Sequence, residues 1–352
     1  ICYENTVDYE AVLGVAREKH VDGIVTAGTD VAVITIGKVC DELGLKGLSF
    51  AAAEIASNKL GMKEKYEEYG VRTARFRLVK LDGSDLKEKA AELTFPLIFK
   101  AVDSSGSRGI RRVDSEEEFE RTRQYVAEST HKDYFLVEEF IEGEEFGAQA
   151  FVQDGKVEFI LPHGDFVFHG DTGVPVGHFA PYDLPEEVIA DCKEQLVKAV
   201  EAMGLDNCAI NADFILKDGK TYVLELGGRS GATCLAELVS IYYGFDYYEK
   251  LIRVALGEKV SFASDQAMPN ASKLLMSDRD GVIVSQTDTN ESSENLVEVQ
   301  FDYQPGDLVH AFHVGPHRIG HVITKGETLK QAKAQLEEAL QKIHIEVKEE
   351  KA

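Results

Sequence analysis

Two carboxylates and an arginine have residue types and a spacing that suit metal-assisted phosphate chemistry. Asp213 and Glu225 lie twelve residues apart, on two runs that predict paired strands across residues 217–220, so their side chains could converge at one end of a sheet. Carboxylate oxygens suit Mg²⁺, whose remaining ligands are usually water and substrate phosphate. Arg229 follows in a glycine-rich turn, where a guanidinium can clamp a carboxylate or a transferring phosphoryl group. These residues predict a Mg²⁺ site beside an anion-binding arginine.

Two lysines further upstream could hold the phosphates themselves. Lys100 ends the apolar run Phe-Pro-Leu-Ile-Phe, and a lysine in such a run is costly to bury unless an anion lies beside it. The loop after it, residues 104–109, is rich in glycine and serine, and glycines let backbone N–H groups converge on phosphate oxygens. Lys59 stands near a predicted helix start. The loop matches neither the P-loop nor the dinucleotide-binding G-x-G-x-x-G pattern.

An acidic segment, residues 137–145, leaves a predicted strand. Its backbone could read the flat edge of a base, and an acidic side chain further on could accept hydrogen bonds from ribose hydroxyls. Taken singly, each of these four pieces has an ordinary explanation: a solvated lysine, an edge strand with a turn, an acidic turn, or exposed hairpin carboxylates. Their order along the chain carries more weight than any one of them.

The ordered set resembles the ATP-grasp superfamily over roughly residues 1–260. The resemblance implies ATP and Mg²⁺ as cofactors, metal binding by Asp213 and Glu225, and catalysis by Arg229 and Lys100, with the arginine stabilising an acyl phosphate. It implies that the adenine is read largely by backbone and that Glu145 binds the ribose. The residues it assigns to ATP binding are Lys59, Lys100, Ser105, Gly106, Ser107, Gly109, Glu138, Glu139, Phe140, Ile141 and Glu145.

One position departs from this family pattern. Many members carry Glu-x-Asn with the asparagine as a further metal ligand, whereas Gly227 stands there in this sequence. The number of Mg²⁺ ions is therefore left open. The stretch 224–233 and the closing stretch 320–326 with its helix resemble bacterial L-amino acid ligases, with some likeness to the carbamoyl-phosphate synthase large chain.

The predicted fold class is α/β (α+β) with an ATP-grasp fold. Residues 1–52 are expected to form a partial α/β domain that precedes the ATP-grasp core, with a strand at 22–26. Residues 53–260 are expected to form the ATP-grasp domain, with a lid subdomain at about 94–138. A small C-terminal α+β part is expected over 261–352.

The histidine, glycine and proline content of residues 162–182 predicts a long irregular loop, and long loops in compact proteins are often functional. We expect His178 in this loop, with Ser230 and Gly231 after the arginine, to face the substrate. The identity of that substrate is not encoded in any motif of the sequence.

Composition narrows the partners and the compartment. The chain has 352 residues and a formal net charge of −24, and so acidic a surface repels nucleic acid and anionic membranes. An odd number of cysteines, five, without a C-x-x-C pair favours reduced thiols in the cytoplasm. No signal peptide or membrane-spanning run is expected, and the start at Ile1 suggests a segment missing upstream.

These features together predict an ADP-forming carboxylate–amine ligase with small-molecule substrates, and they leave a homodimer open. Mg-ATP would activate a carboxylate, that of an amino acid, as an acyl phosphate, which an amine then attacks. A bicarbonate-activating enzyme of the same fold and a catalytically degenerate nucleotide-binding protein remain alternatives, the latter because of Gly227. A dehydrogenase is disfavoured because there is no dinucleotide fingerprint.

Overall fold

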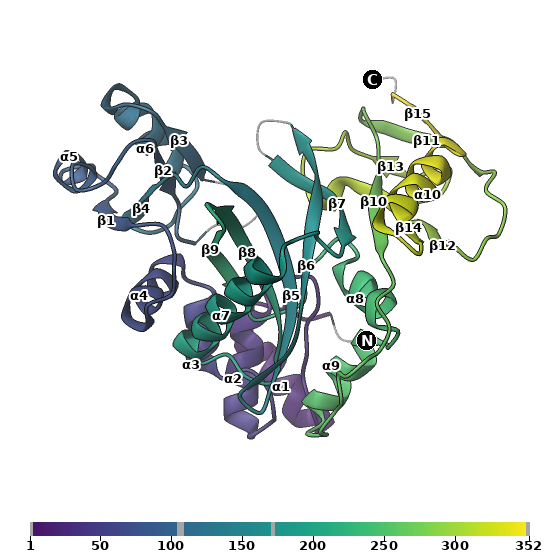
Figure 1. Ribbon diagram of the computed structural model, residues 1–352, viewed down its shortest axis with the longest axis horizontal. Coiled ribbons are helices and arrows are strands. Elements are labelled where there is room, and N and C mark those ends of the chain that lie inside the picture. The colour runs from purple at the N-terminus through teal and green to yellow at the C-terminus, as the bar shows by residue number, and fades with distance from the viewer. Residues whose placement is uncertain (1–2, 104–108, 170–172, 350–352) are drawn as a thin grey trace. The chain divides into compact units, whose positions relative to one another are not determined.

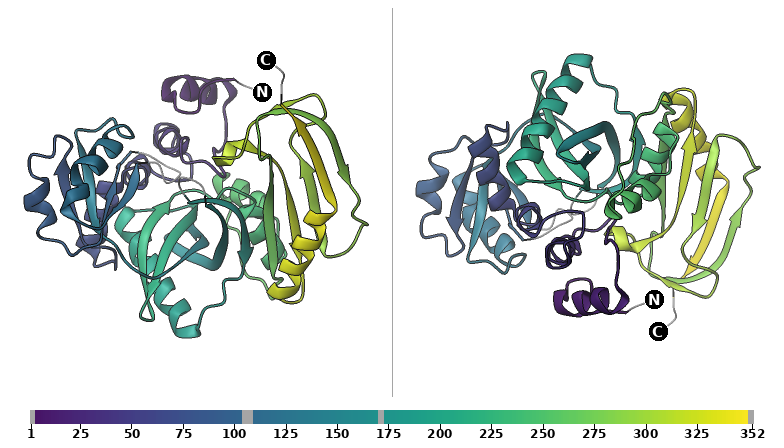
Figure 2. Two further views of the ribbon diagram at one scale, coloured as in Figure 1. Left: turned by 90° about the horizontal axis from the view of Figure 1, so that it is seen from above. Right: turned by 90° about the horizontal axis from the view of Figure 1, so that it is seen from below.

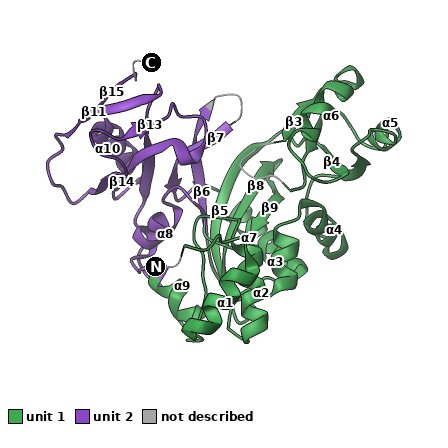
Figure 3. Cartoon of the chain, turned by 180° about the vertical axis from the view of Figure 1, so that it is seen from behind, with its two compact units in different colours: residues 1–160, 184–230, 249–262 green, residues 161–183, 231–248, 263–352 purple. Residues whose placement is uncertain are grey.

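The computed structural model describes residues 3–103, 109–169 and 173–349 (Figure 1). The chain divides into two compact units, each built from three segments (Figure 3). Unit 1 holds residues 1–160, 184–230 and 249–262, and unit 2 holds residues 161–183, 231–248 and 263–352. Helices and antiparallel strands alternate in both, which confirms the α+β class.

Unit 1 begins with a helical segment: α1 (Tyr9–Lys19), α2 (Val33–Leu43) and α3 (Phe50–Ala56). The strand predicted at 22–26 is wrong, since this stretch is extended but pairs with no strand, and only Ala27 forms an isolated bridge, to Ser230. Its apolar Ile24 packs against α1 and α2 instead. Burial on helices therefore produced the apolar pattern that suggested a sheet.

Residues 50–69 form two helices rather than one continuous helix. Helix α3 ends at its C-cap, Ser57. Asn58 caps the next helix, α4 (Lys59–Tyr69), by accepting hydrogen bonds from the amides of Leu60 and Gly61. Such a cap satisfies amides that have no partner within the helix. The break places Lys59 at the first position of a helix.

A four-stranded antiparallel sheet follows, in the order β1-β4-β2-β3, with α5 and α6 beside it (Figure 1). Its elements are β1 (Phe76–Lys80), α5 (Leu86–Ala90), β2 (Leu97–Lys100), β3 (Ile110–Val113), α6 (Phe119–Ala127) and β4 (Tyr134–Glu139). Strand β1 was not predicted from the sequence. Phe99, Phe119 and Phe135 form the aromatic centre of this subdomain core.

Unit 1 also contains the strands that carry the acidic residues. They are β5 (Glu144–Gln153), the start of β6 (Lys156–His169), β8 (Cys208–Lys217) and β9 (Lys220–Gly227), with α7 (Glu186–Met203) packed on β9. Both hairpin turns, Asp154-Gly155 and Asp218-Gly219, have positive φ angles at their two residues. Such angles are typical of two-residue hairpin turns, and the strand pair predicted across residues 217–220 is confirmed.

In unit 2, the strands β12, β14, β10, β7 and the end of β6 are hydrogen-bonded in that order. The strands β13, β11 and β15 form a separate sheet. Helix α10, yellow in Figure 2, packs on β10 and β14. The elements are the end of β6, β7 (Gly173–Ala180), α8 (Leu235–Tyr243), β10 (Asn270–Met276), β11 (Gly281–Asp288), β12 (Leu296–Phe301), β13 (Leu308–Val309), β14 (Arg318–Lys325), α10 (Leu329–Gln341) and β15 (Ile343–Lys348). Helix α9 (Tyr247–Ala255) begins in unit 2 and ends in unit 1.

The irregular loop predicted over residues 162–182 is wrong, because most of it forms the antiparallel strands β6 and β7. Two of its glycines are required by close packing. A Cβ at Gly164 would lie 2.1 Å from the Phe179 ring, and one at Gly177 would lie 2.2 Å from the Ser272 carbonyl oxygen. Glycine here marks close approach within a sheet rather than a turn.

Two sequence expectations concern residues outside the site. Among the described residues, no helix is both long and apolar enough to cross a bilayer. Cys40, Cys192, Cys208 and Cys234 are free thiols and are buried. The division at residues 52 and 260 remains a prediction.

Candidate functional site

The predicted metal ligands lie directly opposite one another. Asp213 on β8 pairs in register with Glu225 on β9, and opposite residues of an antiparallel pair project to the same face. The Lys59 ammonium at the start of α4 lies 3.3 Å from a Glu225 carboxylate oxygen. Asn211, which the sequence analysis did not single out, pairs with Gly227 on the same face. Two hard carboxylates with a cation beside them fit the donor set that Mg²⁺ and a phosphate would need.

Lys100 belongs to a buried ion cluster. Its ammonium lies 3.0 Å from Glu138, and Lys63 lies 3.2 Å from the same carboxylate oxygen. Lys63 also donates a hydrogen bond to the Thr73 hydroxyl. The other Glu138 oxygen, Oε1, accepts no hydrogen bond among the described residues. Two lysines thus share one carboxylate. With both lysines protonated the cluster has a net positive charge, which would attract an anion.

The pKa values in this cluster follow from burial and from these charges. Burial lowers the pKa of Lys63 to about 8, although the charge of Glu138 opposes the change. Burial would raise the pKa of Glu138, but the charges of Lys100 and Lys63 hold it below its ordinary value. Lys63 was missed from the sequence, although it follows Lys59 by four residues, a spacing that places both on one helix face.

The acidic segment divides into buried and exposed parts. The Glu138 side chain is buried in the ion cluster. The amides of Glu139 and Phe140 already donate to the carbonyl oxygens of Arg75 and Pro96. Base recognition by these two amides would break those bonds, so a backbone role is left to the buried Ile141 and to carbonyl oxygens. The ribose role of Glu145, which is exposed on β5, remains a prediction.

Of the predicted phosphate-binding loop, residues 104–109, only Gly109 is described. Ser105, Gly106 and Ser107 lie outside the described residues. Gly109 has a φ of +67°, and a Cβ there would lie 2.7 Å from both Ala101 and Ser129. The backbone conformation and the crowding therefore both require glycine at this end of the loop.

Arg229 is held by a residue that the sequence analysis did not select. Its Nε and Nη2 donate to the two carboxylate oxygens of Asp30, at 2.6 and 2.7 Å, and its Nη1 donates to the Ser230 carbonyl oxygen. Burial would lower the pKa of the guanidinium, but the hydrogen bonds and charge of Asp30, with Asp213 and Glu225, raise it. Arg229 is therefore a firmly charged group within the field of both predicted metal ligands.

The predicted substrate residues fall in different units. Ser230 is buried in unit 1, and its hydroxyl has no hydrogen-bond partner among the described residues. Gly231 and His178 belong to unit 2. The Nδ1 atoms of His178 and His163 lie 2.6 and 3.2 Å from one oxygen of Asp165, so this carboxylate orients both rings. Contact of these residues with a substrate remains a prediction.

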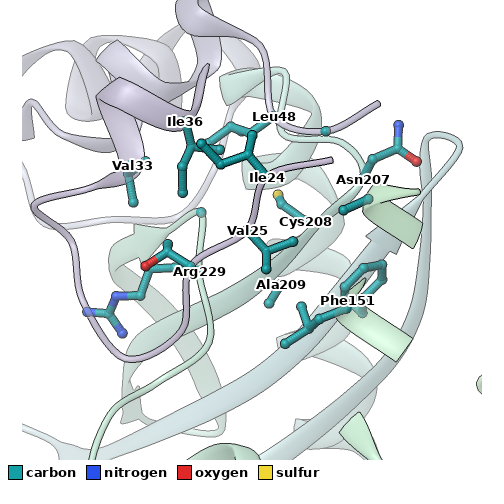
Figure 4. Close-up of a pocket in the computed structure, with 15 residues that line it drawn as sticks. Ile24, Val25, Val33, Ile36, Leu48, Phe151, Asn207, Cys208, Ala209 and Arg229 are labelled. Carbon is teal, nitrogen blue, oxygen red and sulfur yellow. The ribbon is translucent and has the colours of Figure 1, made fainter. Parts of the chain in front are cut away.

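A cavity of about 30 Å³ lies beside Arg229 (Figure 4). It is lined by apolar side chains such as Ile24, Val33 and Phe151, and the Arg229 guanidinium points away from them. Such a volume holds about one or two water molecules. It is a packing gap between the N-terminal segment and the sheet and is too small for a nucleotide or an amino acid.

Comparison with known proteins shows to which family this chain belongs. The ATP-grasp domain profile matches residues 93–237. The solved phosphoribosylglycinamide synthetase of Anaerococcus prevotii is 35% identical, with a TM-score of 0.86, and the match covers 99% of this chain and 88% of that one. The chain belongs to the ATP-grasp family. It is accordingly an ATP-dependent ligase that uses ATP with Mg²⁺ and acts on small molecules.

The C-terminal part of this chain also resembles a known family. The profile for the L-amino acid ligase C-terminal domain 2 matches residues 273–348. The solved L-amino acid ligase of Bacillus licheniformis has a TM-score of 0.78 at 22% identity, over 97% of this chain and 85% of that one. The alanine–anticapsin ligase of Bacillus subtilis strain 168 is 25% identical over 74% of this chain, which spans 58% of that protein's length. The resemblance to this superfamily and to L-amino acid ligases is thus confirmed.

Lys100→Met is expected to weaken ATP binding by about 10- to 100-fold, because a charge-assisted hydrogen bond contributes about 1.5–3 kcal/mol. Folding is expected to suffer less, since Lys63 still pairs with Glu138. Calorimetric titration of a non-hydrolysable ATP analogue measures the affinity. The control is Lys80→Met, at the exposed end of β1 in the same sheet. An unchanged affinity of Lys100→Met would remove its phosphate role.

Proposed function

We propose that this chain is an ADP-forming carboxylate–amine ligase that activates the carboxylate of an amino acid as an acyl phosphate. The observation that carries the proposal is the charge arrangement within unit 1. Glu225 lies against Lys59 and acts electrostatically on Lys63 and on Arg229. The lysines, carboxylates and arginine that we propose for phosphate, metal and substrate binding are therefore close enough to act on one another, which supports a single site.

The proposed chemistry has two steps. A carboxylate oxygen of the substrate attacks the γ-phosphorus of ATP, and ADP leaves. The amine nitrogen then attacks the acyl carbon through a tetrahedral intermediate, phosphate leaves, and the nitrogen loses a proton. Such a sequence needs no nucleophile from the protein and depends on positioning and charge neutralisation.

Each residue of the site has a defined part in this scheme. Lys59 and Lys100 bind phosphate oxygens and reduce the repulsion that an incoming carboxylate meets. Asp213 and Glu225 would hold Mg²⁺, which when bound neutralises further phosphate charge. Arg229 holds the carboxylate and then the oxygens of the tetrahedral centre, where a preorganised cation stabilises developing charge.

An amino acid carboxylate is favoured by the relatives' names as well as by the C-terminal domain match. One curated relative is named alanine–anticapsin ligase, and another, from Thermotoga maritima, is named phosphoribosylamine–glycine ligase and is 28% identical over 51% of this chain. Glycine and alanine are therefore the first carboxylates to test, each with a panel of amines that includes amino acids and aminosugar phosphates. A homodimer in the cytoplasm remains a prediction, which sedimentation and cell fractionation would test.

An oxygen-transfer experiment tests the mechanism. The amino acid is supplied with ¹⁸O in its carboxylate, together with Mg-ATP and the amine. An acyl phosphate passes one ¹⁸O into the released phosphate, whereas an adenylate would pass it into AMP. ADP release with bicarbonate alone would favour the bicarbonate-activating alternative. No ADP release with any substrate would indicate a nucleotide-binding protein without catalysis.

Glu225→Gln is expected to reduce Mg²⁺-dependent ADP release by at least about 100-fold, because it removes a carboxylate from the proposed metal site. Binding of the adenine part should persist, since residues 138–141 are not altered. The measurements are ADP release across a Mg²⁺ titration and adenosine binding. Asp218→Asn, at the turn of the same hairpin, is the control. Parent-like ADP release at saturating Mg²⁺ would contradict the metal assignment.

A further inference from the structure

The Asp30 carboxylate meets Arg229 in a fork-to-fork arrangement. Both oxygens accept, one from Nε and one from Nη2, and the two residues lie 199 positions apart in the sequence. The Arg229 side chain is only 14% exposed. A two-point contact with a planar guanidinium fixes its orientation as well as its distance.

The backbone around Asp30 is tied to the segment that carries the arginine. Ala27 forms a parallel bridge with Ser230, and the Gly28 amide donates to the Ser230 carbonyl oxygen. On its other side, the Asp30 carbonyl oxygen accepts from the Val33 amide at the start of α2. The carboxylate therefore projects from a turn anchored at both ends, which is the support that a positioning group needs.

The glycine that replaces the family's asparagine lies at this contact. A Cβ built at Gly227 would be 3.4 Å from the Asp30 carboxylate and 3.6 Å from Arg229 Nε. A methyl group would fit at those distances, whereas a longer side chain such as asparagine would have to turn away from the ion pair or displace it. The ion pair therefore limits the space for a side chain at position 227.

We propose that Asp30 is a positioning residue that orients Arg229 toward the substrate carboxylate, and that Gly227 provides the space for it. This inference rests on the proposed ligase function. Asp30 does not touch substrate in this account. Asp30 acts through Arg229, and this role gives the N-terminal segment, residues 27–30, a purpose in catalysis.

The hydrogen-bond count of the guanidinium agrees with this role. An arginine has five N–H donors. Arg229 donates two of these N–H groups to Asp30 and one to the Ser230 carbonyl oxygen. Within the described part of the chain, two donors, one on each terminal nitrogen, have no protein partner and remain for a ligand. Asp30 therefore holds the guanidinium and leaves it two N–H donors, so the substrate carboxylate need not displace Asp30.

Asp30→Asn tests the inference by steady-state ADP release and ATP titration. An amide accepts at one atom only and presents N–H to the other donor, so the fork is lost. We expect kcat to fall about 10- to 100-fold while the Kd for ATP stays within about threefold of the parent. Asp30→Glu keeps the charge and both acceptors, and should recover part of kcat. Parent-like kcat in Asp30→Asn would overturn the inference.

Two controls distinguish a positioning role of the Asp30–Arg229 pair from a purely structural one. Asp191→Asn removes the partner of Arg72, another arginine–aspartate pair of unit 1. It should lower the melting temperature without lowering kcat at a temperature where the protein stays folded. Asp30→Asn is also made in the Arg229→Lys background, where it should change kcat by less than about twofold. Multiplicative effects of the two changes would overturn the inference.

Gly227 supplies a matched pair of variants. Gly227→Ala should lower kcat less than Gly227→Asn, which should lower it about as far as Asp30→Asn does. Equal activity of both variants would remove the steric link. Absence of ADP release from the parent would overturn the ligase proposal and this inference with it. Parent turnover with no effect of Asp30→Asn would overturn the inference alone.

Discussion

Arg229→Lys is expected to lower kcat by about 10²–10³-fold while leaving the Kd for ATP within about threefold of the parent. Loss of one preorganised donor at a developing oxyanion typically costs this much. Lysine offers a point charge, which can hold neither the two oxygens of Asp30 nor a tetrahedral centre in a fixed plane. Interactions made mainly in the transition state affect the rate rather than ground-state binding.

The measurement pairs steady-state ADP release with calorimetric ATP titration. Arg72→Lys is the matched control, because Arg72 also bonds an aspartate in unit 1 but belongs to no predicted site. An Arg229→Lys enzyme within about threefold of the parent in both quantities, a difference under about 0.7 kcal/mol, would show that Arg229 is structural. The acyl-phosphate mechanism would then lose its main electrophilic residue.

Glu138→Gln is expected to destabilise the nucleotide-free protein by about 3 kcal/mol. Glu138 and Lys63 are each 2% exposed, and the carboxylate is the counter-ion of both Lys63 and Lys100. Removing one member of a buried ion cluster leaves charge without compensation, which typically costs about 3–5 kcal/mol. Deprotonation of Lys63 limits the loss, because burial has already lowered its pKa to about 8.

ATP should reverse part of this loss, because the triphosphate brings the missing negative charge to Lys100. We therefore expect Mg-ATP to raise the melting temperature of Glu138→Gln by more degrees than it raises that of the parent. Glu92→Gln is the control, since the side chain of Glu92 pairs with Arg77 at the surface and such pairs contribute little. Equal melting temperatures of Glu138→Gln and the parent would contradict the buried cluster.

The hairpin that carries Asp213 and Glu225 could be predicted because its turn is formed by local residues. The two-residue turn Asp218-Gly219 joins the strands and sets their register next to the turn, and a β-bulge between Asp213 and Phe214 then brings Asp213 opposite Glu225. Helix α7 and the glycine that ends α2 were readable for the same reason, since periodicity and caps act over a few residues. The order of such local motifs was enough to indicate the family.

Strands β6 and β7 could not be read from composition. Gly164 and Gly177 resemble loop glycines until Phe179 and the Ser272 backbone are known to pack against them. The same limitation produced the false strand at 22–26, where helices rather than a sheet bury Ile24. A residue's neighbours across space, which the local pattern does not contain, decided both cases.

The sequence by itself determined which residues are candidates for the phosphate and metal chemistry, because such candidates are recognised by their type and their place on short elements. Only the tertiary structure decided what holds them. Glu138 joins Lys63 to Lys100, and Asp30 orients Arg229 from 199 residues away. A charge in a chain of net −24 has many possible partners. Which one it meets is set by the packing of distant elements, and the field of the site follows from that packing.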